Sequence, residues 1–254
     1  MERGWKYAAA SVIGTSHLKS ETGVCQDAHT CTYDHNSDRF VCVVSDGAGS
    51  ASLSDRASRL TCDLVAERIA QDNSEFVHSK DFALAILEGV RAVLESEAAT
   101  ANVGLREFAC TLLVAIVDQE RATFWQIGDG AICFRLCGEE PFRYAFWPDK
   151  GEYANTTYFV TDVKSADELE FDSSCLAIMD LAVFSDGLER LALDFKLGEA
   201  HTNFFVGFFP FLYKEPPGHL LDLERQLAAF LSSDRVNKQT DDDKTLVLAT
   251  LETR

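Results

Sequence analysis

The chain has 254 residues, with 41 Asp and Glu against 23 Lys and Arg, so its formal net charge at pH 7 is −18. This acidity argues against nucleic acid as a partner, because a phosphate backbone attracts stripes of Lys and Arg, and it disfavours docking on an anionic membrane surface. Apolar residues make up 46% of the chain. Charges interrupt every apolar run well before the roughly 18 residues of a membrane span, so we expect a globular protein without a membrane segment.

Short apolar runs predict strands, and apolar residues at helical spacing predict helices. Polar residues 14–38 carry no predicted element. In chain order, the predicted elements are strands at 7–13 and 40–44, helices from 52 and over 81–98, strands at 110–117, 122–127, 131–137 and 181–184, a helix near 219–231, and a strand at 245–251. This order is typical of an α+β fold, and no linker divides the chain. We therefore predict a single domain over 1–254.

Cysteine and histidine spacing predicts no zinc site and no disulfide framework. The eight cysteines form no Cys-x-x-Cys pair and the six histidines form no His-x-x-x-His pair. The N-terminal residues Met1–Lys6 lack the long apolar stretch of a signal peptide. A cytoplasmic protein with reduced thiols is the expectation.

Acidic turns recur at the ends of predicted strands. Val43-Val44-Ser45-Asp46-Gly47 and Val183-Phe184-Ser185-Asp186-Gly187 are nearly the same pentad. Gly128-Asp129-Gly130 follows another strand, and Asp241-Asp242-Asp243 comes directly before the last one. Carboxylates that converge from strand ends repel one another unless a proton or a cation lies between them, and hard divalent ions such as Mg²⁺ prefer oxygen ligands. Asp-Gly is also a common turn dipeptide, so the residues alone leave a metal site and ordinary solvated turns as alternatives.

The order of short motifs along nearly the whole chain resembles the metal-dependent protein serine/threonine phosphatases of the 2C type, in their bacterial branch. The motifs are Gln26-Asp27-Ala28, Ser45-Asp46-Gly47-Ala48-Gly49, Thr111, Gly128-Asp129-Gly130, Ser185-Asp186-Gly187 and Asp242-Asp243-Lys244-Thr245. The resemblance implies an αββα sandwich of two antiparallel sheets flanked by helices. It also implies a centre of two Mn²⁺ or Mg²⁺ ions at one edge of the sandwich.

Positions carried over from the family suggest a role for each acidic turn. Asp46 would bridge both metals, and the Gly47 carbonyl would bind one of them. Asp186 and Asp242 would hold the other metal. Asp129 resembles the position that, together with the Ser-Asp-Gly aspartate, binds a weaker third ion in bacterial members.

Two further carboxylates complete the set that the resemblance implies. Asp27 would orient the attacking water from outside the metal ligands, and Asp243 is a candidate for the same task or for a ligand. The implied reaction is direct attack of a metal-bridging water or hydroxide on a phosphomonoester, without a phosphoenzyme. The catalytic set is then Asp27, Asp46, Asp186 and Asp242, and the thiols take no part.

Three positions depart from the family pattern. Gln26 stands where many members have Glu, which removes one charge. Ala48 stands where some members have a His that protonates the leaving group. The arginine that binds substrate phosphate would fall near residue 22, where the chain has none, so His17 and Lys19 are the nearest candidates for substrate binding.

The expected protein is therefore a phosphatase that acts on phosphoserine and phosphothreonine in proteins. Its implied partners are a phosphoprotein substrate and a cognate Ser/Thr kinase, with no nucleic acid and no membrane, and it is expected to be a monomer. Two alternatives stay open: a catalytically weak, phosphatase-like binding domain, favoured by the departures at Gln26 and Ala48, and a hydrolase of small phosphoesters.

Overall fold

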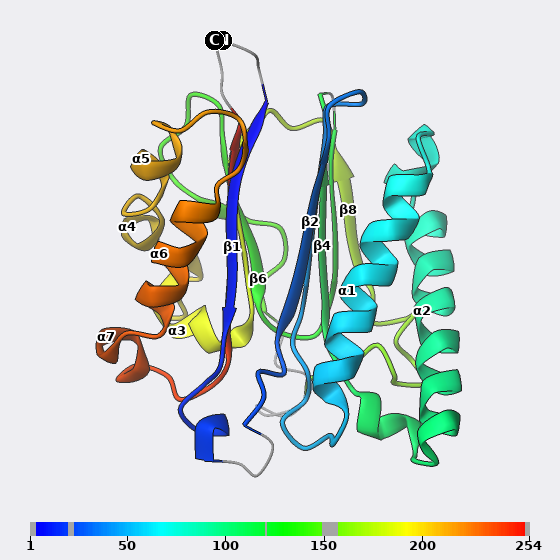
Figure 1. The fold of residues 1–254 in the computed structure, drawn as a ribbon. Helices are drawn as coiled ribbons and strands as arrows, with labels where there is room; N and C mark the ends of the chain where they lie inside the picture. Colours follow the sequence, from blue (N-terminus) through cyan, green and yellow to red (C-terminus); the bar gives the residue numbers. More distant parts are fainter. Residues whose placement is uncertain (1–3, 20–22, 120, 149–156, 252–254) are drawn as a thin grey trace.

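Two antiparallel sheets pack face to face with helices on both outer faces, which confirms the predicted αββα sandwich (Figure 1). The structure is a computed structural model that describes residues 4–19, 23–119, 121–148 and 157–251. Helices α1 (Ser54–Gln71) and α2 (Lys80–Ala101) cover one sheet, and a series of shorter helices covers the other. The shorter helices are α3 (Glu189–Ala192), α4 (Thr202–Phe205), α5 (Phe209–Leu212), α6 (Leu221–Leu231) and α7 (Asp234–Asn237).

The sheet beneath α1 and α2 has five strands in the order β2-β3-β4-β5-β8. Their bounds are β2 (Ala28–Asp34), β3 (Arg39–Ser45), β4 (Leu112–Val117), β5 (Ala122–Ile127) and β8 (Glu170–Ser174). The second sheet has six strands in the order β12-β1-β13-β9-β6-β7. Its strands are β12 (Gly218–His219), β1 (Trp5–Val12), β13 (Lys244–Leu251), β9 (Ile178–Phe184), β6 (Ala131–Leu136) and β7 (Arg143–Tyr144).

Shorter elements fill the connections between these layers. Single 3-10 turns occur at η1 (His17–Lys19), η2 (Glu75–His78), η3 (Leu105–Phe108) and η4 (Asp186–Leu188), and a small ribbon pairs β10 (Leu193–Asp194) with β11 (Glu199–Ala200). Ser79 caps α2, because its hydroxyl accepts a hydrogen bond from the Phe82 amide. No helix within the described residues has both the length and the apolar character needed to cross a membrane.

The β3 strand shows why a continuous apolar run forms here. Its side chains alternate between two cores, as the period of a strand requires. Val41 and Val43 pack toward α1 and α2, whereas Phe40 and Val44 pack between the sheets. A strand buried on both faces reads as uninterrupted hydrophobic sequence, and its rigid setting fixes the position of the polar residues at its end.

The predicted polar stretch 14–38 contains one strand that the sequence did not indicate, β2, and β8 was missed as well. Both strands lie at the edges of the five-stranded sheet, and every residue of β8 is only partly buried. An edge strand needs fewer apolar residues because one side of it is open, so its apolar pattern is weaker than that of a central strand.

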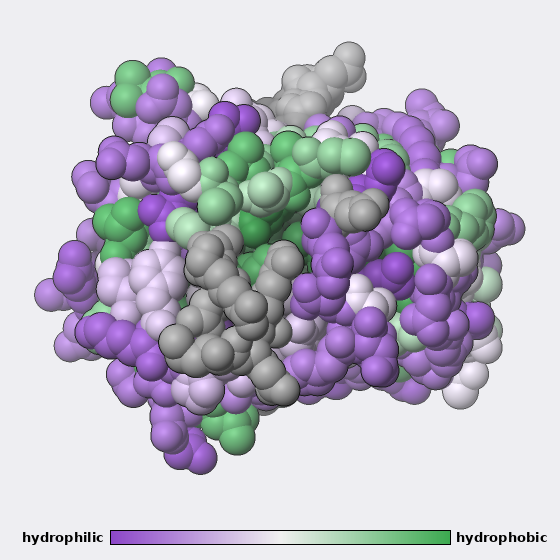
Figure 2. Space-filling model, turned by 90° about the horizontal axis from the view of Figure 1, so that it is seen from above, coloured by the Kyte–Doolittle hydropathy of each residue, from purple (hydrophilic) through white to green (hydrophobic). Residues whose placement is uncertain are grey.

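The two ends of the sandwich differ in character. At one end, β1 finishes and β13 begins, next to the acidic loops. Figure 2 views the opposite end, where β1 begins and β13 ends, and shows a hydrophobic area between hydrophilic flanks. The acidic turns after β3 and β9 and before β13 thus lie at the end away from Trp5 and Leu251.

Candidate metal centre

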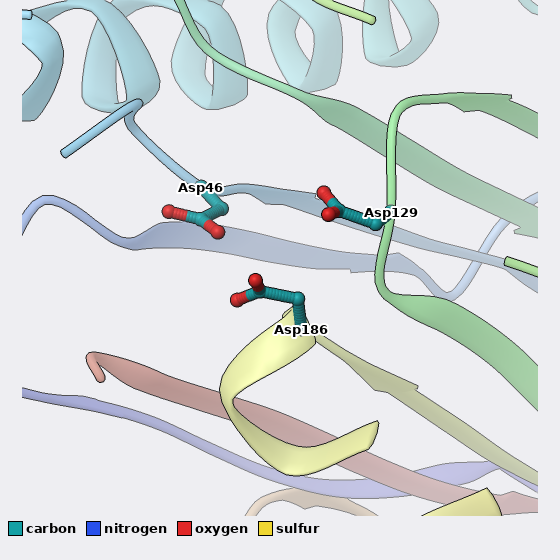
Figure 3. A group of neighbouring side chains, drawn as sticks. All are labelled: Asp46, Asp129 and Asp186. Atoms are coloured by element: carbon teal, nitrogen blue, oxygen red, sulfur yellow. The ribbon is translucent and has the colours of Figure 1, made fainter. Parts of the chain in front are cut away.

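Three carboxylates from three separate loops meet at the acidic end of the sandwich (Figure 3). Asp46 directly follows β3, Asp186 opens the η4 turn after β9, and Asp129 lies in the loop between β5 and β6. Each offers one oxygen to a group in which all the oxygens lie within 4.8 Å of one another. Because β3 and β9 belong to different sheets, the group spans the seam between them.

The neighbouring Thr111 fixes the backbone of the first junction. The Ser45 hydroxyl donates to the Thr111 carbonyl at 2.6 Å. The amide of Asp46 donates to the Thr111 hydroxyl at 2.9 Å, and the amide of Thr111 donates to the Asp46 carbonyl at 2.8 Å. A Cβ atom at Gly47 would lie 2.7 Å from the Ser54 carbonyl oxygen, so only glycine fits after Asp46.

The second junction uses its serine differently. The Ser185 hydroxyl donates to a carboxylate oxygen of Asp27 at 2.6 Å and accepts a hydrogen bond from the Thr245 amide at 2.9 Å. A Cβ atom at Gly187 would lie 2.0 Å from the carbonyl oxygen of Asp243. The second Asp-Gly turn is therefore packed directly against the loop that precedes β13.

Three buried carboxylates here, those of Asp186, Asp46 and Asp27, have pKa values above the usual range of an aspartate. Burial, followed by the negative charges of Asp129 and Asp242, raises the pKa of Asp186 to about 8. Burial and the charges of Asp27 and Asp186 raise the pKa of Asp46 well above its usual range. Burial also raises the pKa of Asp27 to about 6, although the hydrogen bond from Ser185 opposes this. Mutual repulsion and desolvation of this size favour a bound cation or bound protons.

The donor set fits a hard divalent cation. All three members of the group offer carboxylate oxygens, the ligands preferred by Mg²⁺ and Mn²⁺. Two buried oxygens nearby, Asp27 Oδ1 and Gln26 Oε1, have no hydrogen-bond partner among the described residues. Such acceptors are seldom left unsatisfied in a folded protein, and water held by a cation would satisfy them.

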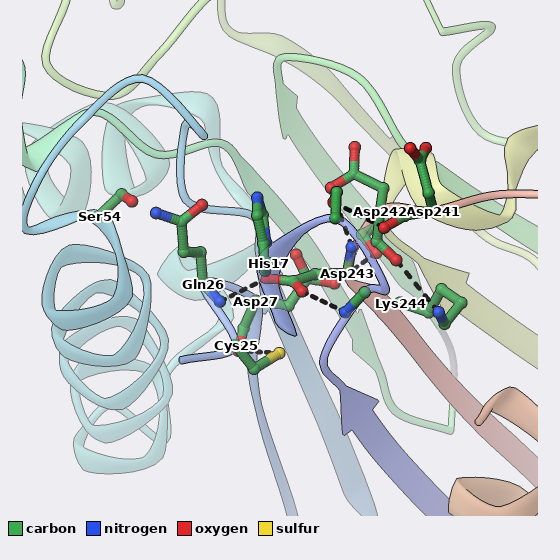
Figure 4. A network of polar contacts seen from close by, with 12 residues as sticks. His17, Cys25, Gln26, Asp27, Ser54, Asp241, Asp242, Asp243 and Lys244 are labelled. Carbon is green, nitrogen blue, oxygen red and sulfur yellow. Dashed lines mark hydrogen bonds and ion pairs between the residues drawn. The ribbon is translucent and has the colours of Figure 1, made fainter. Parts of the chain in front are cut away.

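The structure places the predicted Asp242 and Asp243 in different settings (Figure 4). Asp242 is partly buried just before β13, and its charge contributes to the raised pKa of Asp186, although it is not one of the three grouped carboxylates. Asp243 is 2% exposed, and its two oxygens accept the amides of Gly14 and Gln26, both at 2.6 Å. Both oxygens of Asp243 are therefore held by backbone amides, while a carboxylate oxygen keeps a second lone pair for a further contact.

The two predicted substrate-binding residues lie in the η1 turn. The His17 ring places Nδ1 2.9 Å from an Asp243 carboxylate oxygen. His17 also lines a cavity of about 300 Å³ together with Gln26, Gly49 and Asp55. The side chain of Lys19 lies outside the described part of the structure.

Two residues that sequence reasoning missed hold the loop of Asp129. The Gln126 side-chain amide donates to the carbonyls of Gly128 and Gly130, at 3.1 and 3.2 Å. The Glu189 carboxylate accepts the amide of Gly130 at 3.1 Å. A Gln at the end of an otherwise apolar buried strand was the signal that could have identified Gln126. Glu189 follows Asp186 by one helical turn, and no motif marks it.

The comparisons with known proteins agree with this geometry. The family model described as Protein phosphatase 2C matches residues 13–232. Serine/threonine-protein phosphatase 3 of Escherichia coli (strain K12) is 34% identical over 250 residues, which cover 96% of this chain and 98% of that protein.

Solved structures share the fold at lower identity. The Staphylococcus aureus serine/threonine phosphatase Stp1 has a TM-score of 0.65 at 16% identity, over 100% of this chain and 98% of the other. The catalytic domain of the serine threonine protein phosphatase PstP, in complex with 2 manganese ions, has a TM-score of 0.66 at 14% identity, over 99% of this chain and 100% of the other. The match of the family model over most of the chain and the 34% identity to a full-length relative establish the family: this chain belongs to the protein phosphatase 2C family.

Proposed function

We propose that this protein is a metal-dependent phosphatase that hydrolyses phosphoserine and phosphothreonine in other proteins. The observation that carries the proposal is the group formed by Asp46, Asp129 and Asp186, whose oxygens lie within 4.8 Å of one another at the seam of a 2C-type fold. The matched curated relative is a serine/threonine-protein phosphatase. Mn²⁺ or Mg²⁺ fits the all-oxygen donor set.

The ligands that we assign are Asp46, the Gly47 carbonyl, Asp186 and Asp242 for two cations, with Asp129 and Asp46 for a weaker third. When bound, the cations supply an activated water and neutralise charge on the phosphoryl group. Asp46 and Asp186 come from different sheets, so their separation is set by the packing of the sandwich. Positioning of this kind lowers the cost of bringing reactants together.

Asp27 orients the water that attacks phosphorus. Its Oδ2 is held by the Ser185 hydroxyl at 2.6 Å, whereas its Oδ1 has no partner among the described residues and is available to accept a proton from water. Without cations, burial raises the pKa of Asp27 to about 6, and cations bound nearby would favour its ionised form, which accepts a hydrogen bond from water.

Substrate phosphate binds on the side of the centre formed by the η1 turn. His17 and Lys19 are the cationic residues that we assign to this contact, in place of the arginine found in other members. Asp243 supports His17, because its carboxylate lies beside the ring and is itself held by backbone amides. Ala48 has no ionisable group, so protonation of the leaving serine or threonine falls to water or to another side chain.

The proposal also covers the domain organisation, oligomeric state, compartment and partners of the protein. Residues 1–254 form a single phosphatase domain that acts as a monomer in the cytoplasm, on proteins phosphorylated by a cognate Ser/Thr kinase. The charge of −18 supports the absence of nucleic acid and of anionic membrane surfaces from its partners.

The test is hydrolysis of p-nitrophenyl phosphate and of phosphoserine and phosphothreonine peptides during a Mn²⁺ titration. We expect metal-dependent turnover on both kinds of substrate. Asp46→Asn should lower kcat/KM by about a thousandfold or more, because a shared ligand of the cations is lost. The matched control is Asp222→Asn, which removes an equally charged but exposed carboxylate and should leave turnover unchanged.

Each other outcome identifies one of the alternatives. Mn²⁺ binding without turnover on any substrate would indicate a phosphatase-like binding domain. Turnover on small esters but not on phosphopeptides would indicate a small-phosphoester hydrolase. Near-normal activity of Asp46→Asn would overturn the metal assignment.

A further inference from the structure

Both neighbours of Asp129 in the chain are anchored by side chains that provide no ligand. Gly128 and Gly130 have φ angles of +93° and +89°, a backbone conformation that glycine adopts without strain. The Gln126 amide holds the carbonyls of both glycines. The Asp129 side chain is thus carried on a loop whose two flanking peptides are fixed.

The second anchor ties this loop to the turn that carries Asp186. The amide of Glu189 donates to the Asp186 carbonyl within the η4 turn, while its carboxylate accepts the Gly130 amide at 3.1 Å. One helical turn therefore presents Asp186 to the centre and Glu189 to the neighbouring loop. The loop and the end of β9 are close enough that a Cβ atom at Gly130 would lie 2.7 Å from the Phe184 carbonyl oxygen.

The burial of Glu189 is costly in this location. It is 4% exposed and adds a carboxylate to an end of the molecule that already gathers several. Burying a charge needs compensation by well-placed hydrogen bonds, and a neutral residue would avoid the cost if the position served packing alone. The hydrogen bond from the Gly130 amide joins this buried carboxylate to the loop that carries Asp129.

We propose that Gln126 and Glu189 are positioning residues that hold Asp129 at the distance from Asp46 and Asp186 that a third, weaker cation requires. The inference rests on the role of Asp129 given under the proposed function. Asp129 has an alternative partner, because the Thr157 hydroxyl donates to its Oδ2 at 2.7 Å. The two anchors keep the backbone of the Asp129 loop in place whether this side chain is bound to Thr157 or to a cation.

The experiment is calorimetric titration of the complete chain with Mn²⁺ in the absence of substrate, so that the readout is binding and not turnover. Glu189→Leu removes the acceptor and Gln126→Leu removes the donor. Both should weaken the weakest class of Mn²⁺ site by about 10–100-fold, the usual effect of losing an outer-shell partner, and should leave the tighter sites unchanged. Glu189→Gln keeps an acceptor oxygen and should bind Mn²⁺ nearly as the wild type does.

Asp129→Asn provides the reference for the weak site. In the double variant with Glu189→Leu, the weak site should be no weaker than in Asp129→Asn alone, because both changes act on the same ligand. A wild-type isotherm for Glu189→Leu and Gln126→Leu would overturn the proposal, as would equal weakening of all sites. Loss of the folded state in both leucine variants, seen by circular dichroism, would assign the two residues to folding instead. If the proposed function were wrong, the result would differ: Mn²⁺ would bind as predicted, but the wild type would show no turnover.

Discussion

The two Ser-Asp-Gly junctions have nearly the same sequence and the same place at the end of a buried strand, yet their serines make different contacts. Ser45 and Ser185 are both fully buried. The Ser45 hydroxyl donates to a backbone carbonyl, that of Thr111. The Ser185 hydroxyl donates to the Asp27 carboxylate. Asp27 directly precedes β2, the edge strand of the other sheet, so this bond joins the second junction to that sheet. The serine of one pentad therefore holds a backbone carbonyl in place, and the serine of the other holds a carboxylate in place.

The charges around the two junctions also differ. The first lies beside Gln26, whose backbone carbonyl accepts the Gly47 amide and whose side chain is neutral. The second lies among the charges of Asp129 and Asp242, which help raise the pKa of Asp186. The Gln26 side chain therefore adds no charge at the first junction, where Asp27 and Asp186 are the carboxylates whose charges raise the pKa of Asp46.

The largest predicted effect concerns the carboxylates at the second junction. It is the change of the free energy of unfolding with pH in the metal-free protein. Asp27 and Asp186 have pKa values raised to about 6 and about 8, so the folded protein binds more protons than the unfolded chain between about pH 4 and 8. The free energy of unfolding should then be highest near pH 4 and should fall as the pH rises to about 8, by on the order of a few kcal/mol in total.

Thermal denaturation in EDTA from pH 5 to 9 measures this slope. Asp186→Asn should flatten it and stabilise the protein at pH 8, whereas Asp222→Asn, which changes an exposed carboxylate, should not. Saturating Mg²⁺ should also remove the decline, because cations replace protons in the centre. A metal-free protein that gained stability between pH 6 and 8 would contradict the raised pKa values.

A smaller effect should follow from removing each serine hydroxyl in turn. Ser185→Ala releases Asp27 Oδ2. We expect kcat to fall by about 10–100-fold, the usual effect of removing a side chain that orients groups around a metal site. Ser45→Ala leaves the Thr111 carbonyl without its donor and should cost about 1–3 kcal/mol of stability with little change in kcat. Steady-state kinetics and chemical denaturation of the two variants would test the contrast. Equal losses of kcat would show that the two serines have the same task.

The smallest effect should come from evening the charges of the two junctions. Gln26→Glu places a carboxylate beside Asp46 and should lower the Kd of one Mn²⁺ site by about tenfold or less, because affinity in oxygen sites rises with the number of charged ligands. The same change should steepen the pH dependence of stability in EDTA. Calorimetry against the wild type gives the Kd, and an unchanged titration would show that Gln26 lies too far from the cation to affect it.

The sequence identified the parts of the centre that depend on strand ends and turn chemistry. Asp46, Asp129 and Asp186 each follow a buried strand and precede a glycine, so both local pattern and family resemblance pointed to them. The layers of the fold followed from long apolar runs in the same way. Strands β2 and β8 were missed because nearly all their residues are only partly buried at the sheet edges, which weakens the periodic apolar signal.

The residues that tie the centre together could not be predicted from local pattern. The contact between Ser185 and Asp27 joins positions 158 residues apart, and the contact between Gly130 and Glu189 joins positions 59 apart. Asp243 illustrates the same limit: nothing in its acidic run indicates that the backbone amides of Gly14 and Gln26 bind its oxygens. Only the packing of the two sheets determines which acidic residues face one another.

The ladder between β1 and β13 has a practical consequence for handling this protein. It pairs Trp5 with Leu251 at one end and Val12 with Lys244 at the other, so Trp5 and Leu251 lie side by side at the end of the sandwich away from the acidic loops (Figure 1). The ladder has eight residue pairs at about 3.4 Å each, so its Trp5–Leu251 end lies roughly 25 Å from its Val12–Lys244 end. Attachment to a bead or sensor chip through either end should therefore leave the acidic loops facing the solution and open to large phosphoproteins.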